Sequence, residues 1–320
     1  MLETLLYPKA IAVIGASRNP GKVGYAVLAN LVNNGFKGPI IPVNPEADEI
    51  LGLKCYKSIG EYKGPIDLSI IMVGAKYVKD ALQSSIKAGA KSVIVITAGF
   101  KEVGAEGAKA EQELVEICRA GGVRMVGPNC LGVLNTDHHM NATFAPSVPP
   151  PGKISVISQS GALCVAILDW AAEQKLGLGK VISFGNKADL NEVDFIETLA
   201  EDKETKVIAG YLESIKEGDK FLRIAEQAAS VKPVVILKVG ITSAGAKPPR
   251  HTPAAWRAPT WLTARRSSAR GSFGRKISRR CSIMRRPLPC SRSRMANAWP
   301  SSPTPAAPAS WRRTPLKASA

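Results

Sequence analysis

The stretch Ile11–Gly24 constrains the fold of this 320-residue chain more than any other part of it. A β-branched run at its start predicts a buried strand, Gly15 ends that strand, and a helix is expected over Tyr25–Asn33. A strand, a glycine loop and a helix in this order present free backbone N–H groups to a phosphate. Arg18 and Lys22 add positive charge to the loop. The alternative is an ordinary strand-to-helix turn, because a glycine loop alone is weak evidence.

The spacing of the loop glycines argues against a nicotinamide cofactor. Gly15, Gly21 and Gly24 form the pattern G-x5-G-x2-G, whereas dinucleotide enzymes use G-x-G-x-x-G. The next expected strand ends at Val43 and is followed by Asn44, where an NAD site would place an Asp or Glu for the ribose hydroxyls. The loop therefore predicts a phosphorylated nucleotide other than NAD, and a nicotinamide oxidoreductase is disfavoured.

Residues 1–130 alternate predicted strands and helices, which indicates a parallel sheet covered by helices on both faces. The strands are expected at Ile11–Ile14, Ile40–Val43, Leu68–Val73, Val93–Thr97 and Arg124–Val126, and the further helices at Val78–Ala88 and Ala108–Ala120. Ligands of such sheets bind beyond the carboxyl ends of the strands. The segments there are Gly15–Lys22, Val43–Pro45, Val73–Lys76 and Thr97–Phe100, so one extended ligand could contact all four.

Residues 131–152 are interpreted as an irregular linker, because prolines are frequent in them. His138 and His139 lie in this stretch, and we expect them to be solvated loop residues, since no third side chain is spaced for metal binding.

A second α/β unit is expected over residues 153–247. Its strands are predicted at Ile154–Ile157, Val181–Phe184, Val207–Leu212 and Val234–Val239. Ser158, Gln159, Ser160 and Gly161 follow the first of these strands and lead into a helix that runs to about Gln174. This turn is either a second anion site or an ordinary N-cap made by Ser158 or Ser160. Glu213 follows another strand, where it could orient a cationic or imidazole partner or be solvated.

The net charge of +17 is confined to the last part of the chain. Residues 248–320 hold 16 of the 43 Lys and Arg residues and no Asp or Glu, so residues 1–247 carry 27 basic and 26 acidic side chains. This uneven distribution disfavours a dedicated nucleic-acid-binding protein. The basic stretch has no helical or alternating pattern, and we expect it to be disordered and to bind polyanions only weakly.

Cysteine usage and hydropathy point to a reduced compartment. None of the six cysteines has a metal-type spacing, and we expect no metal site; they are Cys55, Cys118, Cys130, Cys164, Cys281 and Cys290. We find neither a signal peptide nor an apolar run long enough to cross a bilayer. A cytoplasmic protein without a membrane partner is therefore expected.

Seven ordered motifs in residues 1–247 resemble those of the NDP-forming acyl-CoA synthetases. The match is to the α-type half, which is related to the succinyl-CoA synthetase α subunit. The motifs are GASRNPGKVG (15–24), VNP (43–45), TAGF (97–100), GPNCLG (127–132), NATFAP (141–146), SQSGAL (158–163) and GNKAD (185–189). The resemblance implies a Rossmann-like CoA-binding domain over residues 1–130, followed by a flavodoxin-like domain that would be incomplete at residue 247.

The resemblance also assigns roles to individual residues. It implies that CoA is held by Gly15, Ala16, Ser17, Arg18, Gly21, Lys22, Val43, Asn44, Pro45, Val73, Ala75, Thr97 and Ala98. It implies a phosphate site at Ser158, Gln159, Ser160 and Gly161, and makes Glu213 the acid that supports a phosphohistidine. The family reaction is acyl-CoA + phosphate + ADP ⇌ acid + CoA + ATP. It proceeds through an acyl phosphate and a phosphohistidine, and ADP, ATP and magnesium bind to an ATP-grasp domain absent from this chain.

The resemblance ends near Lys247. The family continues with a Ser-His-Thr-Gly segment that carries the nucleophilic histidine, whereas this chain reads Pro-Arg-His-Thr-Pro around His251. In a shifted reading frame, Arg250 to Trp256 can encode Ser-His-Thr-Gly-Ser-Leu, and Trp299 to Trp311 can encode Ala-Ile-Val-Thr-Asn-Ala-Gly-Gly-Pro-Gly-Ile-Met. We therefore expect residues 248–320 to be an out-of-frame translation and His251 to be a coincidental histidine.

Two functions remain open on this reading. The first is the CoA-binding part of an acyl-CoA synthetase, inactive as this chain and in need of an ATP-grasp partner. The second is a non-catalytic CoA-binding sensor module, such as that fused to a protein acyltransferase. The histidine segment in the shifted frame favours the synthetase, because a sensor does not need that residue.

Overall fold

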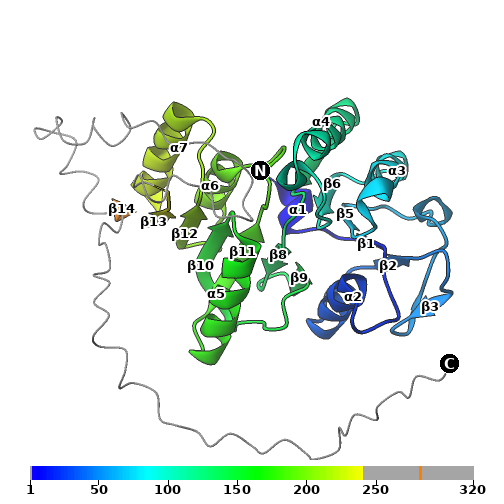
Figure 1. Cartoon of the computed structure of the whole chain (residues 1–320). Helices are drawn as coiled ribbons and strands as arrows, with labels where there is room; N and C mark the ends of the chain where they lie inside the picture. The colour runs from blue at the N-terminus through cyan, green and yellow to red at the C-terminus, as the bar shows by residue number, and fades with distance from the viewer. Residues whose placement is uncertain (1, 241–280, 283–320) are drawn as a thin grey trace, which may run out of the picture. The chain divides into compact units, whose positions relative to one another are not determined.

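The computed structural model describes residues 2–240 and 281–282, and two sheets follow one another along them (Figure 1). The first is a parallel five-stranded sheet with the order β2-β1-β5-β6-β7. Its strands are β1 (Ile11–Ile14), β2 (Ile40–Val43), β5 (Leu68–Ile71), β6 (Ser92–Val95) and β7 (Arg124–Val126). Each overlaps a strand that the sequence predicts, because short runs of buried β-branched residues dominate them.

Helices cover both faces of this sheet, as the strand–helix alternation predicts. They are α1 (Glu3–Leu6) and α2 (Val23–Asn33) on one face, and α3 (Ala75–Lys87) and α4 (Ala105–Ala120) on the other. Ile11 and Val13 belong to the same apolar cluster as α2, whereas Ala12 and Ile14 belong to the cluster of α3 and α4. Successive side chains of a strand point to opposite faces, so one short strand anchors both layers. Short elements complete this part: β3 (Glu49–Ile50), β4 (Leu53–Lys54), η1 (Ile59–Glu61) and η2 (Lys101–Val103).

The second sheet has the order β14-β13-β12-β10-β11-β8-β9. Its strands are β8 (Gly132–Asn135), β9 (Met140–Thr143), β10 (Pro151–Ser158), β11 (Leu178–Ser183), β12 (Val207–Leu212), β13 (Val234–Lys238) and β14 (Cys281–Ser282). The pairings from β11 to β14 are parallel, while β8 runs antiparallel to β11 and to β9. The helix α5 (Gly161–Glu173) packs in one apolar cluster, and α6 (Glu192–Glu201) and α7 (Gly218–Val231) pack in another. This is the Rossmann-like sheet followed by a flavodoxin-like sheet that the resemblance implies.

The prediction that residues 131–152 form an irregular linker is wrong. Residues 132–135 and 140–143 form β8 and β9, and β10 already begins at Pro151. β8 pairs with β11 through Val133 and Leu134, and β9 pairs with β8, so the stretch is an integral edge of the second sheet. Prolines cluster only after β9, which is why composition alone concealed the two strands.

The expectation that His138 is solvated is also wrong. Its ring packs edge-on against Tyr7 and Phe36, at 5.6 Å between ring centroids in each pair. Its Nε2 atom lies 2.8 Å from the carbonyl oxygen of Pro8. His138 therefore fastens the N-terminal segment to the second sheet, while its neighbour His139 is exposed.

The two sheets are joined by a shared apolar cluster and by a buried ionic network. The cluster includes Ile70 and Val126 of the first sheet and Ile157 of the second. In the network, Lys180 is fully buried and lies 2.9 Å from Asp202, whose other carboxylate oxygen accepts a 2.8 Å hydrogen bond from the Tyr7 hydroxyl. Because Tyr7 follows α1 and Asp202 follows α6, these contacts tie distant segments together.

Candidate functional site

The loops at the carboxyl edge of the first sheet are held to one another by hydrogen bonds from side chains to backbone carbonyls and by a close approach at Gly15. The Asn44 side chain donates to the carbonyl of Ala16 at 2.7 Å, which joins the loop after β2 to the loop after β1. The Thr97 hydroxyl donates to the carbonyl of Val73 at 2.7 Å, which joins the loops after β6 and β5. Gly15 has φ +90°, and a Cβ there would lie 3.0 Å from the carbonyl carbon of Met72. The four predicted segments therefore form one continuous rim.

The glycine loop after β1 has the features of an anion-binding turn. A Cβ on Gly24 would lie 2.0 Å from the carbonyl oxygen of Gly15, so only glycine allows α2 to approach the loop this closely. Among the described residues, the amides of Ala16, Ser17 and Arg18 have no protein acceptor. The helix α2 then begins without a side-chain cap. Free amide groups and the positive end of a helix favour a bound anion.

The charged residues of this loop are exposed. Arg18 and Lys22 both face solvent, and the Arg18 guanidinium donates to the carbonyl of Glu46 at 3.1 Å. Asn44 uses both ends of its amide within the protein, since its oxygen accepts from the amide of Glu46 at 2.8 Å. Its side chain thus positions the loops relative to one another.

The turn after β10 is built by its own side chains. Ser160 is the N-cap of α5, and its hydroxyl accepts from the amide of Leu163 at 3.3 Å. The Ser158 hydroxyl is fully buried and donates to the carbonyl of Ser160 at 2.8 Å. Of the two serines that the sequence offers as N-cap, Ser160 therefore caps the helix, and Ser158 braces the turn before it. The amides of Gly161 and Ala162 have no acceptor among the described residues, so they remain available to an anion.

Gln159 couples this turn to the residues after β12. Its side-chain oxygen accepts from the amides of Glu213 and Ser214, each at 3.0 Å, and its amide nitrogen donates to the Ser214 hydroxyl at 2.9 Å. The carbonyl of Glu213 accepts from Lys238 at 2.9 Å. The Glu213 backbone is thus held from both sides, while its carboxylate has no hydrogen-bond partner among the described residues.

Burial raises the pKa of the Glu213 carboxyl, and the positive charges of Lys187 and Lys238 act in the opposite direction. A half-buried carboxylate with a fixed backbone and a free side chain can orient a neighbouring N–H donor such as an imidazole.

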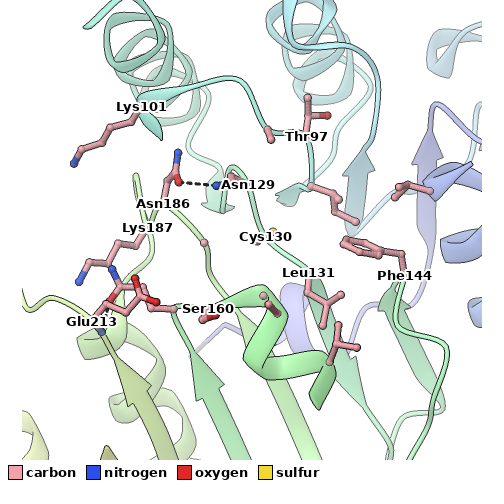
Figure 2. A pocket seen from close by; sticks show the side chains of 18 of the residues that line it. Thr97, Lys101, Asn129, Cys130, Leu131, Phe144, Ser160, Asn186, Lys187 and Glu213 are labelled. Carbon is pink, nitrogen blue, oxygen red and sulfur yellow. Dashed lines mark hydrogen bonds between the residues drawn. The ribbon is translucent and has the colours of Figure 1, made fainter. Parts of the chain in front are cut away.

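The carboxyl edges of both sheets open into one cavity of about 1040 Å³ (Figure 2). Of the predicted site residues, it brings together Val73, Thr97, Ala98, Gln159, Ser160, Gly161 and Glu213. The others lie outside its lining: Gly15, Ala16, Ser17, Arg18, Gly21, Lys22, Val43, Asn44, Pro45, Ala75 and Ser158. The cavity nevertheless reaches Val23, the first residue of α2, so the glycine loop lies at its margin.

The two walls of the cavity differ in character. Figure 2 shows Leu131 and Phe144 on one side, and Lys101, Asn186 and Lys187 on the other, with Ser160 and Glu213 at the lower end. An elongated ligand with an apolar part and an anionic part would match these two walls.

Sequence reasoning missed the polar residues contributed by the loop after β11. Asn186 donates to Glu102 at 2.6 Å and to Glu111 at 2.7 Å, and accepts from Asn129 at 3.2 Å. Lys187 is only 2% exposed and donates to Glu192 at 2.9 Å and to the carbonyl of Ser214 at 2.8 Å. The signal was present, because these residues belong to the Gly-Asn-Lys-Ala-Asp motif, but a motif does not reveal which partners it contacts.

The described part of the chain has neither a cluster of metal-ligating side chains nor a helix suited to cross a membrane. Within residues 2–240, no three His, Cys, Asp or Glu side chains are grouped so that they could hold a metal ion. The helices of that same region are all too short or too polar to traverse a bilayer. His251 and the expected disordered tail lie outside the described residues.

Comparisons with known proteins match both halves of this architecture. Residues 9–136 match the family model of the CoA binding domain, and residues 151–266 match that of the succinyl-CoA ligase like flavodoxin domain. The second match thus extends past Lys247, where the sequence analysis places the end of the resemblance.

Two curated relatives are acetate–CoA ligases of the ADP-forming type. The chain is 48% identical over 246 residues to acetate–CoA ligase [ADP-forming] I of Archaeoglobus fulgidus, a match that covers 77% of this chain and 36% of the relative. It is 43% identical over 250 residues to the α subunit of acetate–CoA ligase [ADP-forming] I of Pyrococcus furiosus, covering 77% of this chain and 54% of the relative. The chain therefore spans about half, or less, of the length of these relatives.

A solved structure has the same fold. The dinucleotide-forming acetyl-coenzyme A synthetase 1 of Candidatus Korarchaeum cryptofilum, in complex with phosphate and ADP, is 41% identical, with a TM-score of 0.75. The similarity covers 77% of this chain and 53% of that one.

Proposed function

Because the chain belongs to the α-type half of the NDP-forming acyl-CoA synthetase family, we propose that it is the CoA-binding part of such a synthetase. The reaction would convert acyl-CoA, phosphate and ADP into acid, CoA and ATP. The observation that carries the proposal is the convergence of two parallel-sheet edges on one cavity. One edge has the features of a nucleotide site and the other those of a phosphoryl site.

The first edge would hold the CoA substrate. The free amides of residues 16–18 and the start of α2 would bind its phosphates, with Arg18 and Lys22 supplying charge. Gly15 and Gly24 would allow the close backbone packing that leaves the loop amides accessible to a phosphate. Val73, Thr97 and Ala98 would line the path by which the thioester end enters the cavity.

The second edge would serve the phosphoryl group. Phosphate attack on the thioester carbonyl breaks the C–S bond, releases CoA and leaves an acyl phosphate. The amides of Gly161 and Ala162 would offset the negative charge on the moving phosphoryl group. Glu213 would orient the imidazole that accepts this group, while Gln159 keeps Glu213 in place.

The final transfer to ADP would depend on further parts of the synthetase. The family uses an ATP-grasp domain or subunit for nucleotide binding, and magnesium would bind there. The Ser-His-Thr-Gly segment that carries the family's nucleophilic histidine does not occur in residues 1–320. We therefore propose that this chain binds CoA and acyl-CoA, and that it makes no ATP by itself.

We also propose a cytoplasmic location. Support comes from Cys55, Cys118, Cys130 and Cys164, which are all buried and free of disulfides in the described part of the chain.

A binding comparison and an activity assay test the proposal. In equilibrium dialysis with CoA, we expect Arg18→Ala to weaken binding about tenfold, because it removes a charge-assisted phosphate contact. Arg119→Ala, which changes an exposed arginine of α4, is the matched control. In a kinase-coupled assay with acetyl-CoA, phosphate and ADP, the chain mixed with an ATP-grasp β subunit should produce no ATP. ATP production by this mixture would refute the proposal that the chain is inactive. Unchanged CoA binding by Arg18→Ala would refute the assignment of the glycine loop to CoA.

A further inference from the structure

The polar wall of the cavity holds more lysine than the proposed function uses. Lys101, Lys187 and Lys216 all line the cavity, whereas Glu213 is the only carboxylate among its described lining residues. Lys101 comes from the first sheet's side, and Lys216 comes from the loop between β12 and α7. A wall with three ammonium groups and one carboxylate favours an anion.

Hydrogen bonds place Lys101 and Lys216 beside the loop that carries Asn186 and Lys187. One carboxylate oxygen of Glu111 accepts from the backbone amide of Lys101 at 3.3 Å and from the side chain of Asn186 at 2.7 Å. Lys101 therefore begins beside the loop that carries Lys187. The Lys216 ammonium donates to the carbonyl of Lys187 at 2.9 Å, so it reaches the same loop from the other side. Figure 2 shows Lys101, Asn186 and Lys187 along one wall.

The ammonium groups retain unused donors. Each has three N–H bonds. Lys187 uses two of them on Glu192 and Ser214, and Lys216 uses one on Lys187. Among the described residues, the Lys101 ammonium has no acceptor. The wall therefore offers several donors to a ligand with several acceptor oxygens.

The nearby carboxylates do not neutralise these donors at the cavity surface. Glu192 is buried against Lys187, and Glu102 and Glu111 both accept from Asn186 without lining the cavity. Burial lowers the pKa of Lys187 and of Lys216; the negative charge of Glu192 raises the pKa of both, and the positive charge of Lys101 lowers it. These amines repel one another, and a bound anion would relieve that repulsion.

We infer that Lys101 and Lys216, together with the buried Lys187, bind a tetrahedral oxyanion, inorganic phosphate, in the cavity that Gly161 and Ala162 also line. This inference rests on the proposed function, in which phosphate is a substrate, and it adds binding residues from both halves of the chain. Phosphate held between the two groups of donors would be placed beside the thioester before it attacks.

The test measures phosphate binding to the full 320-residue chain by calorimetry, at fixed ionic strength and with CoA present. The variants are Lys101→Gln, Lys216→Gln and Lys101→Arg, with Lys109→Gln as the control, because Lys109 is exposed on α4 outside the cavity. We expect each Gln variant to weaken phosphate binding about tenfold, and Lys101→Arg and Lys109→Gln to preserve it. Sulfate should compete with phosphate, and chloride should not.

Each outcome separates the lysine site from the proposed function. Absence of phosphate binding in the wild type, or equal binding by all variants, overturns the lysine site while CoA binding leaves the proposed function intact. Loss of binding in Lys109→Gln as well would also overturn it, since the effect would then be one of general charge. If phosphate binds through these lysines and CoA does not bind, the lysine site stands and the proposed function fails. Circular dichroism of each variant verifies that it is folded.

Discussion

The side-chain nitrogen of Asn186 lies 2.7 Å from a carboxylate oxygen of Glu111, and this hydrogen bond joins the second sheet to the first. The same nitrogen also donates to Glu102 at 2.6 Å. Glu111 is only 6% exposed, and this burial raises the pKa of its carboxyl. One amide therefore satisfies two carboxylates at the boundary between the two halves of the candidate site.

We expect Asn186→Ala to destabilise the chain. The substitution removes one donor from each of two partly buried carboxylates, those of Glu102 and Glu111, which costs about 1–3 kcal/mol. Urea unfolding of the full chain measures the change in the free energy of unfolding. Asn33→Ala, an exposed residue of α2, is the control and should change it little. Equal stability of Asn186→Ala and wild type would show that the contact contributes nothing.

We expect Gly24→Ala to abolish most CoA binding. Its Cβ would lie 2.0 Å from the carbonyl oxygen of Gly15, so the loop or α2 must move. Forced displacement of packed backbone costs about 1–3 kcal/mol. The amides of residues 16–18 would then no longer point toward the same phosphate. CoA affinity and the thermal unfolding midpoint measure the two effects.

The control for this glycine is Gly60→Ala, because the nearest atom to a Cβ there is 3.9 Å away and the residue lies in η1, away from the cavity. If Gly24→Ala binds CoA as well as Gly60→Ala does, the close approach of α2 is not required for binding.

Asp202 makes the stability of the chain depend on pH in acid. Burial alone would raise its pKa, but hydrogen bonds from Thr205, Lys180 and Tyr7 outweigh it and lower the pKa to about 2. The folded-state pKa is below the unfolded one, so this stabilisation is present above about pH 4 and is lost as the pH falls to about 2. We expect unfolding free energies to decline over this range.

The variant Asp202→Asn isolates that contribution. It should be less stable than wild type near pH 7 by about 2 kcal/mol, and the difference should shrink as the pH falls. Guanidinium unfolding at a series of pH values measures it. A difference that stays constant down to pH 2 would mean that Asp202 is not the group that titrates.

A shifted frame should be visible in the gene. We expect resequencing to locate a slip near Pro248, and the repaired chain to contain Ser-His-Thr-Gly in place of the present residues. With that segment restored, the chain should accept a phosphoryl group from acetyl phosphate on its histidine, as phosphoamide-sensitive labelling would measure. An uninterrupted frame that encodes the present tail would contradict this.

The sequence predicted the sheets better than it predicted the site. β1, β2, β7 and β12 coincide with their predicted bounds, because buried parallel strands are short apolar runs between clear breaks. The partners of Asn186 could not be predicted, since Glu102 lies 84 residues away and Glu111 lies 75 residues away. β8 and β9 were missed because antiparallel pairing makes Asn135 and Asn141 part of a buried edge. Local pattern does not determine such long-range contacts.

Titration calorimetry of the wild-type chain with CoA, followed by NAD, tests the account most directly. The amides after β1 and the exposed Arg18 should bind CoA at one saturable site, and NAD should bind at least about a hundredfold more weakly, because Asn44 follows β2 directly, where an NAD site would place an acid for the ribose. Absence of heat with CoA, or equal affinity for both nucleotides, would contradict the assignment of the glycine loop to CoA.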